Sequence, residues 1–198
     1  MSALPNDTEI IIVTGLPRSG TSLVMQMLVA GGVPVMADGL RKPDTDNPNG
    51  YFELQAVKEI RRSSLWLDEA TGKAIKIIYR LTYYLPPRYR YRVLLVQRNL
   101  AEVVASQSAM LRRNRAAASD IPNARLIELF QDELSRFQTW LQQQKNISTL
   151  HLWHDRLLSE PLKEAMRMRE FIGRGDVKSM ASIIDGTLYR QRYRLNTA

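Results

Sequence analysis

A glycine-bounded loop that combines hydroxyl and guanidinium side chains is the part of this sequence best suited to chemistry. It spans residues 15–22 (GLPRSGTS) and directly follows the apolar run at residues 10–13 (IIIV). A buried strand, a tight loop and a helix start form an anion site, because backbone N–H groups at a helix N-terminus point at a bound phosphate. Gly20 would let the backbone approach the ligand, and Arg18 could form a charge-assisted pair with it. Phosphate binding is therefore favoured over a turn with incidental glycines.

The loop departs at one position from the pattern of nucleotide hydrolases. That pattern, G-x-x-x-x-G-K-[ST], places a Lys after the second glycine. Thr21 stands there in this sequence, and the basic residue comes earlier, as Arg18. The loop therefore predicts phosphate binding without standard ATP or GTP chemistry.

A second basic and hydroxyl pair lies further along the chain. Arg98 follows the apolar run at residues 91–97, and Ser106 lies about two turns into the helix expected next, on the side of Glu102. Ligands of open α/β sheets bind at the carboxyl ends of the strands. An Arg at that position and a hydroxyl on the helix can clamp a second phosphate, although either residue alone is a common feature.

Apolar runs and helical patterns alternate along the chain and define the elements that must position these residues. Buried parallel strands are expected at residues 9–14, 74–78, 91–97 and 148–153. Helices are expected at residues 21–30, 52–63, 100–113 (with Asn99 as N-cap), 123–146 and from Pro161 to about Gly173. This alternation predicts an α/β fold with three layers, α/β/α, around a central mostly parallel sheet, similar to P-loop NTPases. The 198 residues suit a single domain, 1–198.

Composition narrows the class of protein. The absence of cysteine excludes disulfides, thiolate metal sites and cysteine nucleophiles, and with no visible secretory signal it predicts a cytoplasmic protein. The longest apolar run is far shorter than the roughly 20 residues of a membrane span, so no span is expected. The net charge is +8, and residues 76–115 hold nine basic residues and one acid. Such a block indicates an anionic partner, a nucleic acid or a phosphorylated small molecule, or else a solvated basic face.

Together the two phosphate motifs resemble those of the sulfotransferases that use 3′-phosphoadenosine 5′-phosphosulfate (PAPS). Residues 17–22 (PRSGTS) resemble the family's 5′-phosphosulfate loop, P-[KR]-S-G-[TS]-[TS]. Arg98 and Ser106 match its 3′-phosphate motif, an Arg followed eight residues later by a Ser. Residues 46–53 and 184–192 are also similar to bacterial members.

The resemblance implies in-line transfer of a sulfuryl group from PAPS to a hydroxyl or amine, which leaves 3′-phosphoadenosine 5′-phosphate (PAP), with no metal. Arg18 would stabilise charge on the leaving oxygen, and since Arg stays charged, no proton donation is expected from it. Arg190 could close over the 3′-phosphate. The implied cofactor-binding residues are Pro17, Arg18, Ser19, Gly20, Thr21, Ser22, Arg98, Ser106 and Arg190.

Sulfuryl transfer also needs a base that takes the proton of the acceptor. Glu53 is the preferred candidate, because it follows a turn-forming Asn-Pro-Asn-Gly and is expected to start a helix. The alternative is that Glu53 only supplies favourable charge at the helix N-terminus. His154 is a weaker candidate, and His151, within an expected strand, is interpreted as structural. Lys76 could neutralise a sulfate oxygen.

Two other functions remain open on the sequence alone. A nucleotide or small-molecule kinase with a variant P-loop would account for the loop, although no acidic residue ends the runs at 75–78 or 93–97 to hold Mg²⁺. A basic nucleic-acid-binding protein would account for the block at 76–115, where tyrosines alternate with arginines, but it is the less favoured partner class. The acceptor is expected to be a small molecule or a carbohydrate.

Overall fold

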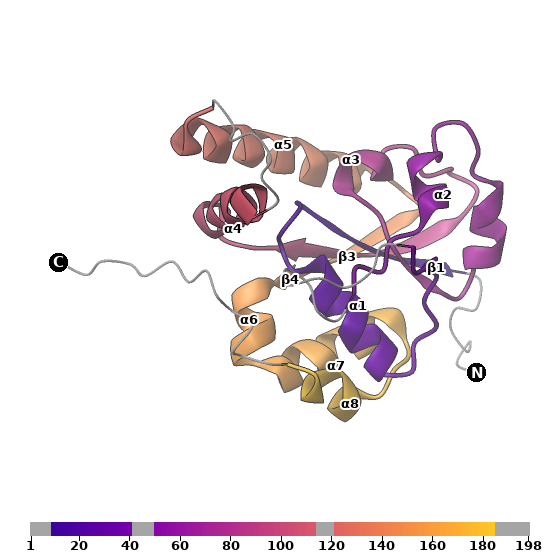
Figure 1. Cartoon of the computed structure of the whole chain (residues 1–198). Helices are drawn as coiled ribbons and strands as arrows, with labels where there is room; N and C mark the ends of the chain where they lie inside the picture. The colour runs from indigo at the N-terminus through magenta and orange to yellow at the C-terminus, as the bar shows by residue number, and fades with distance from the viewer. Residues whose placement is uncertain (1–8, 41–49, 114–120, 185–198) are drawn as a thin grey trace.

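Four parallel strands form the centre of the molecule, with helices on both faces (Figure 1). The computed structural model describes residues 9–40, 50–113 and 121–184. The strands are β1 (Glu9–Gly15), β2 (Ala74–Lys76), β3 (Arg90–Gln97) and β4 (Ile147–Trp153), and they lie in the order β2-β1-β3-β4. The predicted three-layer α/β/α fold with a parallel sheet is therefore confirmed.

Each face of the sheet has its own set of helices. One face carries α1 (Thr21–Ala30), α6 (His154–Ser159), α7 (Pro161–Ile172) and α8 (Val177–Ser182). The other carries α2 (Gln55–Lys58), the 3-10 helix η1 (Leu65–Ala70), α3 (Tyr79–Thr82), α4 (Leu100–Arg113) and α5 (Asn123–Gln143). No helix among the residues described is both long and apolar enough to cross a membrane.

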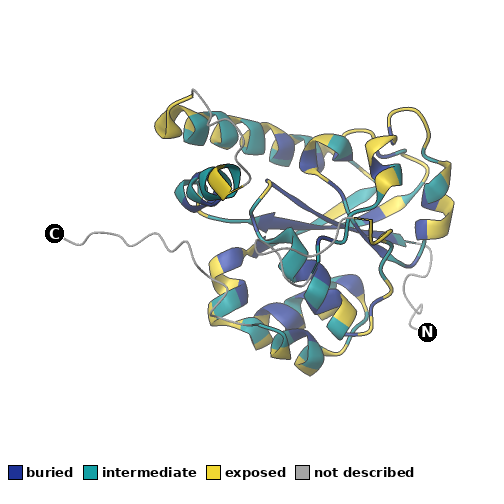
Figure 2. Ribbon diagram, in the orientation of Figure 1, coloured by how far each residue is buried: buried dark blue, intermediate teal, exposed yellow. Residues whose placement is uncertain are grey.

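The core has two halves, one on each face of the sheet, and β1 contributes to both. Figure 2 shows buried positions along the central strands and on helices of both faces. Ile10 and Ile12 pack in the half that contains Phe137 of α5, whereas Ile11 and Val13 pack in the half that contains the buried face of α1. Because successive strand residues point to opposite faces, a strand covered on both sides is apolar throughout. Residues 10–13 are all apolar because β1 is covered by helices on both faces of the sheet.

The prediction of a helix over residues 52–63 is wrong in its extent. Only Gln55–Lys58 form an α-helix, and the backbone before it cannot be helical, since Phe52 has φ 52° and Leu54 is extended. The short helices α3, α6 and α8 were not predicted. Each has four to six residues, too few to show a helical period.

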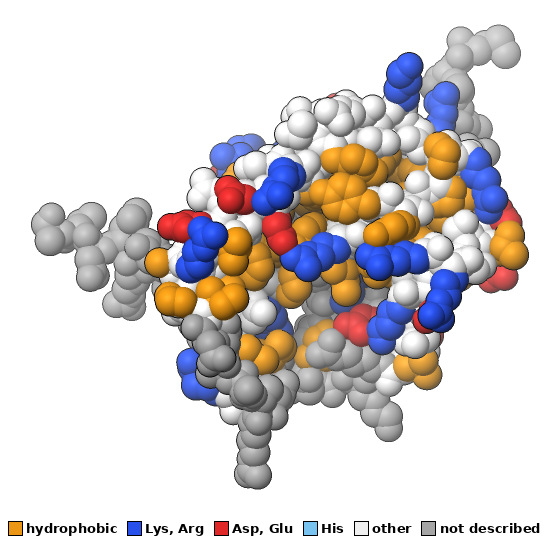
Figure 3. Space-filling model, turned by 90° about the horizontal axis from the view of Figure 1, so that it is seen from above, with side chains coloured by type: hydrophobic (Ala, Val, Ile, Leu, Met, Phe, Trp, Pro, Cys, Tyr) orange, Lys and Arg blue, Asp and Glu red, His pale blue; other side chains and the backbone are white. Residues whose placement is uncertain are grey.

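The basic block at residues 76–115 is partly neutralised in the folded chain. Within the part of the block that the structure describes, at least four arginines form ion pairs, and three of their acids come from outside the block. On the face that carries α3 and α5, the Lys and Arg side chains are scattered among hydrophobic and acidic ones (Figure 3). The pairs are Arg80–Glu133, Arg88–Asp68, Arg92–Glu9 and Arg98–Glu102.

Candidate phosphate-binding site

The loop predicted to bind phosphate connects β1 to α1. Because the loop follows β1, it leaves the sheet at the carboxyl ends of the strands, where parallel α/β sheets bind ligands. β1 lies between β2 and β3, so the loop is near the middle of the sheet. The amide of Ser19 donates to the carbonyl of Leu16 (3.1 Å), which closes a tight turn directly before the helix. α1 then presents the backbone N–H groups of its first turn at this edge.

Two glycines of this loop are required by close contacts. A Cβ on Gly15 would lie 2.4 Å from the carbonyl oxygen of Val96 in β3. A Cβ on Gly20, where φ is 105°, would lie 2.5 Å from Cδ2 of His154 at the start of α6. Gly20 was predicted to allow backbone approach to a phosphate. The structure adds a reason within the protein, the ring of His154.

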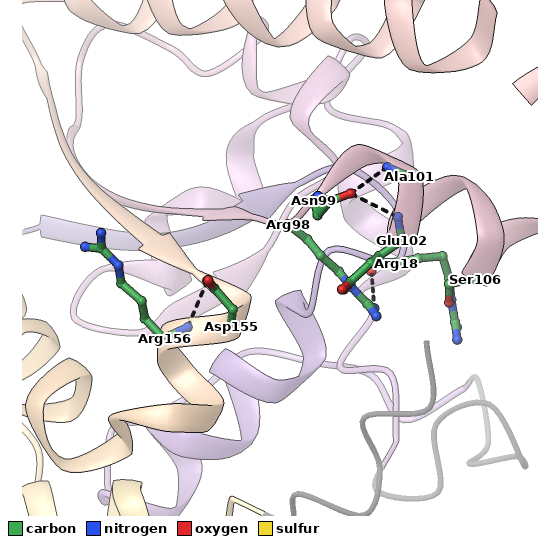
Figure 4. Close-up of polar contacts among 8 residues, drawn as sticks. All are labelled: Arg18, Arg98, Asn99, Ala101, Glu102, Ser106, Asp155 and Arg156. Atoms are coloured by element: carbon green, nitrogen blue, oxygen red, sulfur yellow. Dashed lines mark hydrogen bonds and ion pairs between the residues drawn. The ribbon is translucent and has the colours of Figure 1, made fainter. Parts of the chain in front are cut away.

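Arg18 joins the two predicted phosphate motifs. Its Nε donates to Oγ of Ser106 (3.0 Å), and its carbonyl oxygen accepts from Nη1 of Arg98 (3.2 Å) (Figure 4). Arg18 also has φ 70°, a left-handed conformation that costs a non-glycine residue about 1–2 kcal/mol. Residues far apart in the sequence thus meet at one point, and the backbone strain lies in the loop itself.

Arg98 is held by a buried carboxylate. Its Nε lies 2.9 Å from Oε2 of Glu102, and the two side chains are only 10% and 7% exposed. α4, which carries Glu102, begins as predicted, because Oδ1 of Asn99 accepts from the amide of Ala101 (2.9 Å). Glu102 was expected on the same side of the helix as Ser106, with no role of its own. The spacing of four residues between Arg98 and Glu102 is the signal in the sequence that could have predicted their pairing.

Ser19 has an unusual environment for a hydroxyl side chain. It is 1% exposed, and its Oγ has no hydrogen-bond partner among the residues that the structure describes. A buried donor without a partner costs about 1–3 kcal/mol, which a phosphate or sulfate oxygen in the loop would recover. Thr21 and Ser22 lie half-buried in the first turn of α1, and Pro17 is exposed. These residues fit a phosphosulfate group.

His154 is a neutral packing partner of the loop. Burial, followed by the positive charge of Arg98, lowers the pKa of His154 to about 4. His151 lies in β4, where its Nδ1 is 3.0 Å from Oε1 of Gln97, and burial lowers its pKa as well. Near neutral pH both imidazoles are therefore uncharged.

Lys76 and Glu53 lie on segments that meet at the carboxyl end of β2. The ammonium of Lys76 donates to the backbone carbonyl of Tyr51 and lies 5.8 Å from the centroid of its ring. Lys76 is thus half-buried rather than at an exposed strand end. The prediction that Glu53 starts a helix is wrong, since Glu53 lies two residues before α2. Its backbone carbonyl accepts a hydrogen bond from the amide of Asp38 (3.0 Å).

Two further predictions concern Arg190 and the absence of a metal. Arg190 lies outside the residues that the structure describes. Across residues 9–40, 50–113 and 121–184, no group of three or more His, Asp or Glu side chains could hold a metal ion. The absence of a metal from the reaction stays a prediction.

Similarity by sequence is undetectable, since no family model and no curated protein matches the chain. Solved structures do match. A mouse sulfotransferase in complex with PAP is 16% identical with a TM-score of 0.51, and the match covers 91% of this chain and 63% of that one. The sulfotransferase domain of the Synechococcus olefin synthase is 13% identical with a TM-score of 0.53, covering 97% and 87%.

A retinol dehydratase in complex with androsterone and PAP is 14% identical, with a TM-score of 0.51 over 92% of this chain and 66% of that one. The chain thus spans less than two thirds of the length of the mouse enzyme. At these identities the likeness concerns the arrangement of the backbone. The chain has the fold of the sulfotransferases, as the two phosphate motifs predicted.

Proposed function

We propose that this chain is a single-domain, cytoplasmic sulfotransferase that moves a sulfuryl group from PAPS to a hydroxyl or amine of an acceptor. The observation that carries the proposal is the meeting of Arg18 with Arg98 and Ser106. A ligand with phosphates on both the 5′ and the 3′ oxygens of one ribose needs two anion sites side by side. The sulfotransferase fold and the PAP bound to two structural neighbours support the same donor.

In this proposal the protein aligns the donor and stabilises charge, and PAPS supplies the sulfuryl group. Backbone N–H groups of the loop and the hydroxyls of Ser19, Thr21 and Ser22 bind the 5′-phosphosulfate. Arg18 stabilises the negative charge that develops on the leaving oxygen, and Arg98 with Ser106 binds the 3′-phosphate. Fixed donors of this kind act without reorganising during the reaction, which is the main source of catalysis in such transfers.

Glu53 is the proposed base and Lys76 the proposed partner of a sulfate oxygen. The contact of Lys76 with Tyr51 supports this assignment, because it brings the chain segment of Glu53 to the carboxyl end of β2, next to β1 and its loop. The proposed acceptor is a small molecule or a carbohydrate. The androsterone bound to the retinol dehydratase is an example of a small molecule in this fold.

The rival functions gain less from the structure. A kinase needs carboxylates for Mg²⁺, and Glu102, next to the loop, is paired with Arg98. A nucleic-acid-binding surface needs a continuous basic stripe, whereas ion pairs and hydrophobic side chains interrupt the basic block (Figure 3). Neither rival is therefore proposed.

Ligand binding tests the proposal. Millimolar PAP should raise the melting temperature of the protein in the presence of EDTA, since ligands that bind only the folded state stabilise it. AMP, which lacks the 3′-phosphate, should bind more weakly. An unchanged melting temperature with PAP would reject the proposal, and stabilisation by ATP only when Mg²⁺ is present would favour the kinase.

The 3′-phosphate role of Arg98 needs a conservative variant. Arg98→Ala would break a buried ion pair with Glu102, at a cost of about 3–5 kcal/mol. Arg98→Lys keeps the charge but loses the fork of donors, so affinity for PAP should fall while affinity for adenosine 5′-phosphosulfate stays. Arg125→Lys, in an exposed pair with Glu128, is the matched control. Equal losses for both ligands would contradict the assignment.

A further inference from the structure

Four residues form a chain of contacts between the phosphate loop and the start of α4. Arg98 lies just before α4, and Glu102 and Ser106, four residues apart, share one side of the start of that helix. Arg98 contacts Glu102 and the carbonyl of Arg18, and the side chain of Arg18 returns to Ser106 (Figure 4). Glu102 is the one member of this set that the proposed function does not use.

We propose that Glu102 is a positioning residue that orients Arg98 toward the loop and the 3′-phosphate of the donor. This inference rests on the proposed function. The carboxylate of Glu102 accepts a hydrogen bond from Nε of Arg98, and Nη1 of Arg98 donates to the carbonyl oxygen of Arg18. Both charged side chains are at least nine-tenths buried, so little water competes with their contact. Fixing one edge of a planar guanidinium fixes the direction of its remaining donors.

The cap of α4 adds to this positioning. Oδ1 of Asn99 accepts from the amides of both Ala101 (2.9 Å) and Glu102 (3.4 Å). The backbone of Glu102 is thus held in the first turn of the helix by the residue that follows Arg98. The carboxylate therefore starts from a defined place relative to the strand end that carries Arg98.

A simpler role for Glu102 makes the opposite prediction. If the carboxylate were only a negative charge beside an anion site, its removal would tighten the binding of PAP, because like charges repel. If it positions Arg98, its removal weakens the binding of PAP and does so mainly through the 3′-phosphate. The sign of the change separates the two roles.

The experiment compares PAP with AMP by calorimetry on Glu102→Ala, Glu102→Gln and the wild type. We expect the ratio of the AMP to the PAP dissociation constant to fall roughly fivefold or more in Glu102→Ala. In Glu102→Gln this ratio should fall less, since the amide oxygen of the new side chain still accepts a hydrogen bond from Nε of Arg98. Glu128→Gln, which loses an exposed pair with Arg125, should leave the ratio unchanged.

The outcomes separate this inference from the proposed function. A wild type that binds PAP no better than AMP overturns both. A wild type that prefers PAP, with a ratio that rises or stays in the Glu102 variants, overturns the positioning role alone. A merely structural role would weaken both ligands equally and leave the ratio unchanged, which also overturns it. If Glu102→Ala does not fold, the direction of the change in Glu102→Gln decides.

Discussion

Replacing Gly20 by alanine tests how the phosphate loop is held against α6. The new Cβ would lie 2.5 Å from Cδ2 of the buried His154, far inside van der Waals contact. The ring belongs to a residue that is 8% exposed, so it has little room to move away. The backbone is also unfavourable for alanine, since φ at this position is 105°.

The two effects have separate magnitudes. A non-glycine residue in a sparsely populated region of φ and ψ costs about 1–3 kcal/mol. Overpacking a buried contact costs about 1–3 kcal/mol more. Together they amount to about 2–6 kcal/mol, a large part of the roughly 5–15 kcal/mol by which domains of this kind are stable. We expect Gly20→Ala to lower the free energy of unfolding by this amount.

Gly32→Ala is the matched control, because it isolates the cost of the backbone conformation. Gly32 also has positive φ, 75°, but a Cβ there would meet nothing within 4 Å. Urea unfolding monitored by tryptophan fluorescence should show a larger loss for Gly20→Ala than for Gly32→Ala. The difference is the cost of the contact with His154.

A double variant makes the test specific to the ring. In a His154→Ala background the contact is gone, so Gly20→Ala should cost about 1–3 kcal/mol less than it does in the wild type. Strictly additive losses, or equal losses for Gly20→Ala and Gly32→Ala, would refute the packing argument. Glycine would then be needed at this position for its φ alone.

Three further changes test separate parts of the molecule. Because the folded pKa of His154 is about 4 against an ordinary value of 6.5, the unfolded chain binds more protons between these pH values, so the free energy of unfolding should decrease as pH falls through this window. Urea unfolding should show a shallower pH slope in His154→Gln, where His151 and the carboxylates with lowered pKa still contribute, and an unaltered slope would contradict the burial of a neutral imidazole. Tyr79→Phe removes a hydroxyl that donates to Glu133 and should cost about 1–2 kcal/mol, seen as a lower urea midpoint; a midpoint equal to that of the wild type would show that the contact does not stabilise the fold. Lys76→Met should keep the affinity for PAP and lower sulfuryl transfer about 100-fold, and retained turnover would remove Lys76 from the reaction.

The sequence predicted best those elements that carry their own signals. α1 and α4 have the predicted bounds, because an apolar period meets a glycine pair at the end of α1 and an asparagine cap at the start of α4. The segment before α2 could not be predicted in this way. Its course depends on the positive φ of Phe52, which nothing in the residue type indicates.

For the candidate site, the sequence named residues that the structure brings together but did not predict how they contact one another. Two motifs named Arg18, Arg98 and Ser106, but their direct hydrogen bonds depend on how β1 and β3 bring the loop to α4. The charge of the basic block was misleading for a related reason. A count along the chain cannot include Glu9 and Glu133, which pair with the block's arginines only after folding.

The balance of charge in the site makes the effect of Mg²⁺ on PAP binding an informative measurement. Arg18 and Arg98 bring two positive charges, Glu102 cancels one, and His154 is neutral. PAP carries about three to four negative charges on its two phosphates. The remaining stabilisation must come from the N–H groups and hydroxyls at the start of α1, or from a metal ion, which supplies it in most phosphoryl transfers. PAP binding that is as tight in EDTA as in Mg²⁺ would show that the loop's N–H groups and hydroxyls suffice, whereas binding that requires Mg²⁺ would place the loop closer to the kinases.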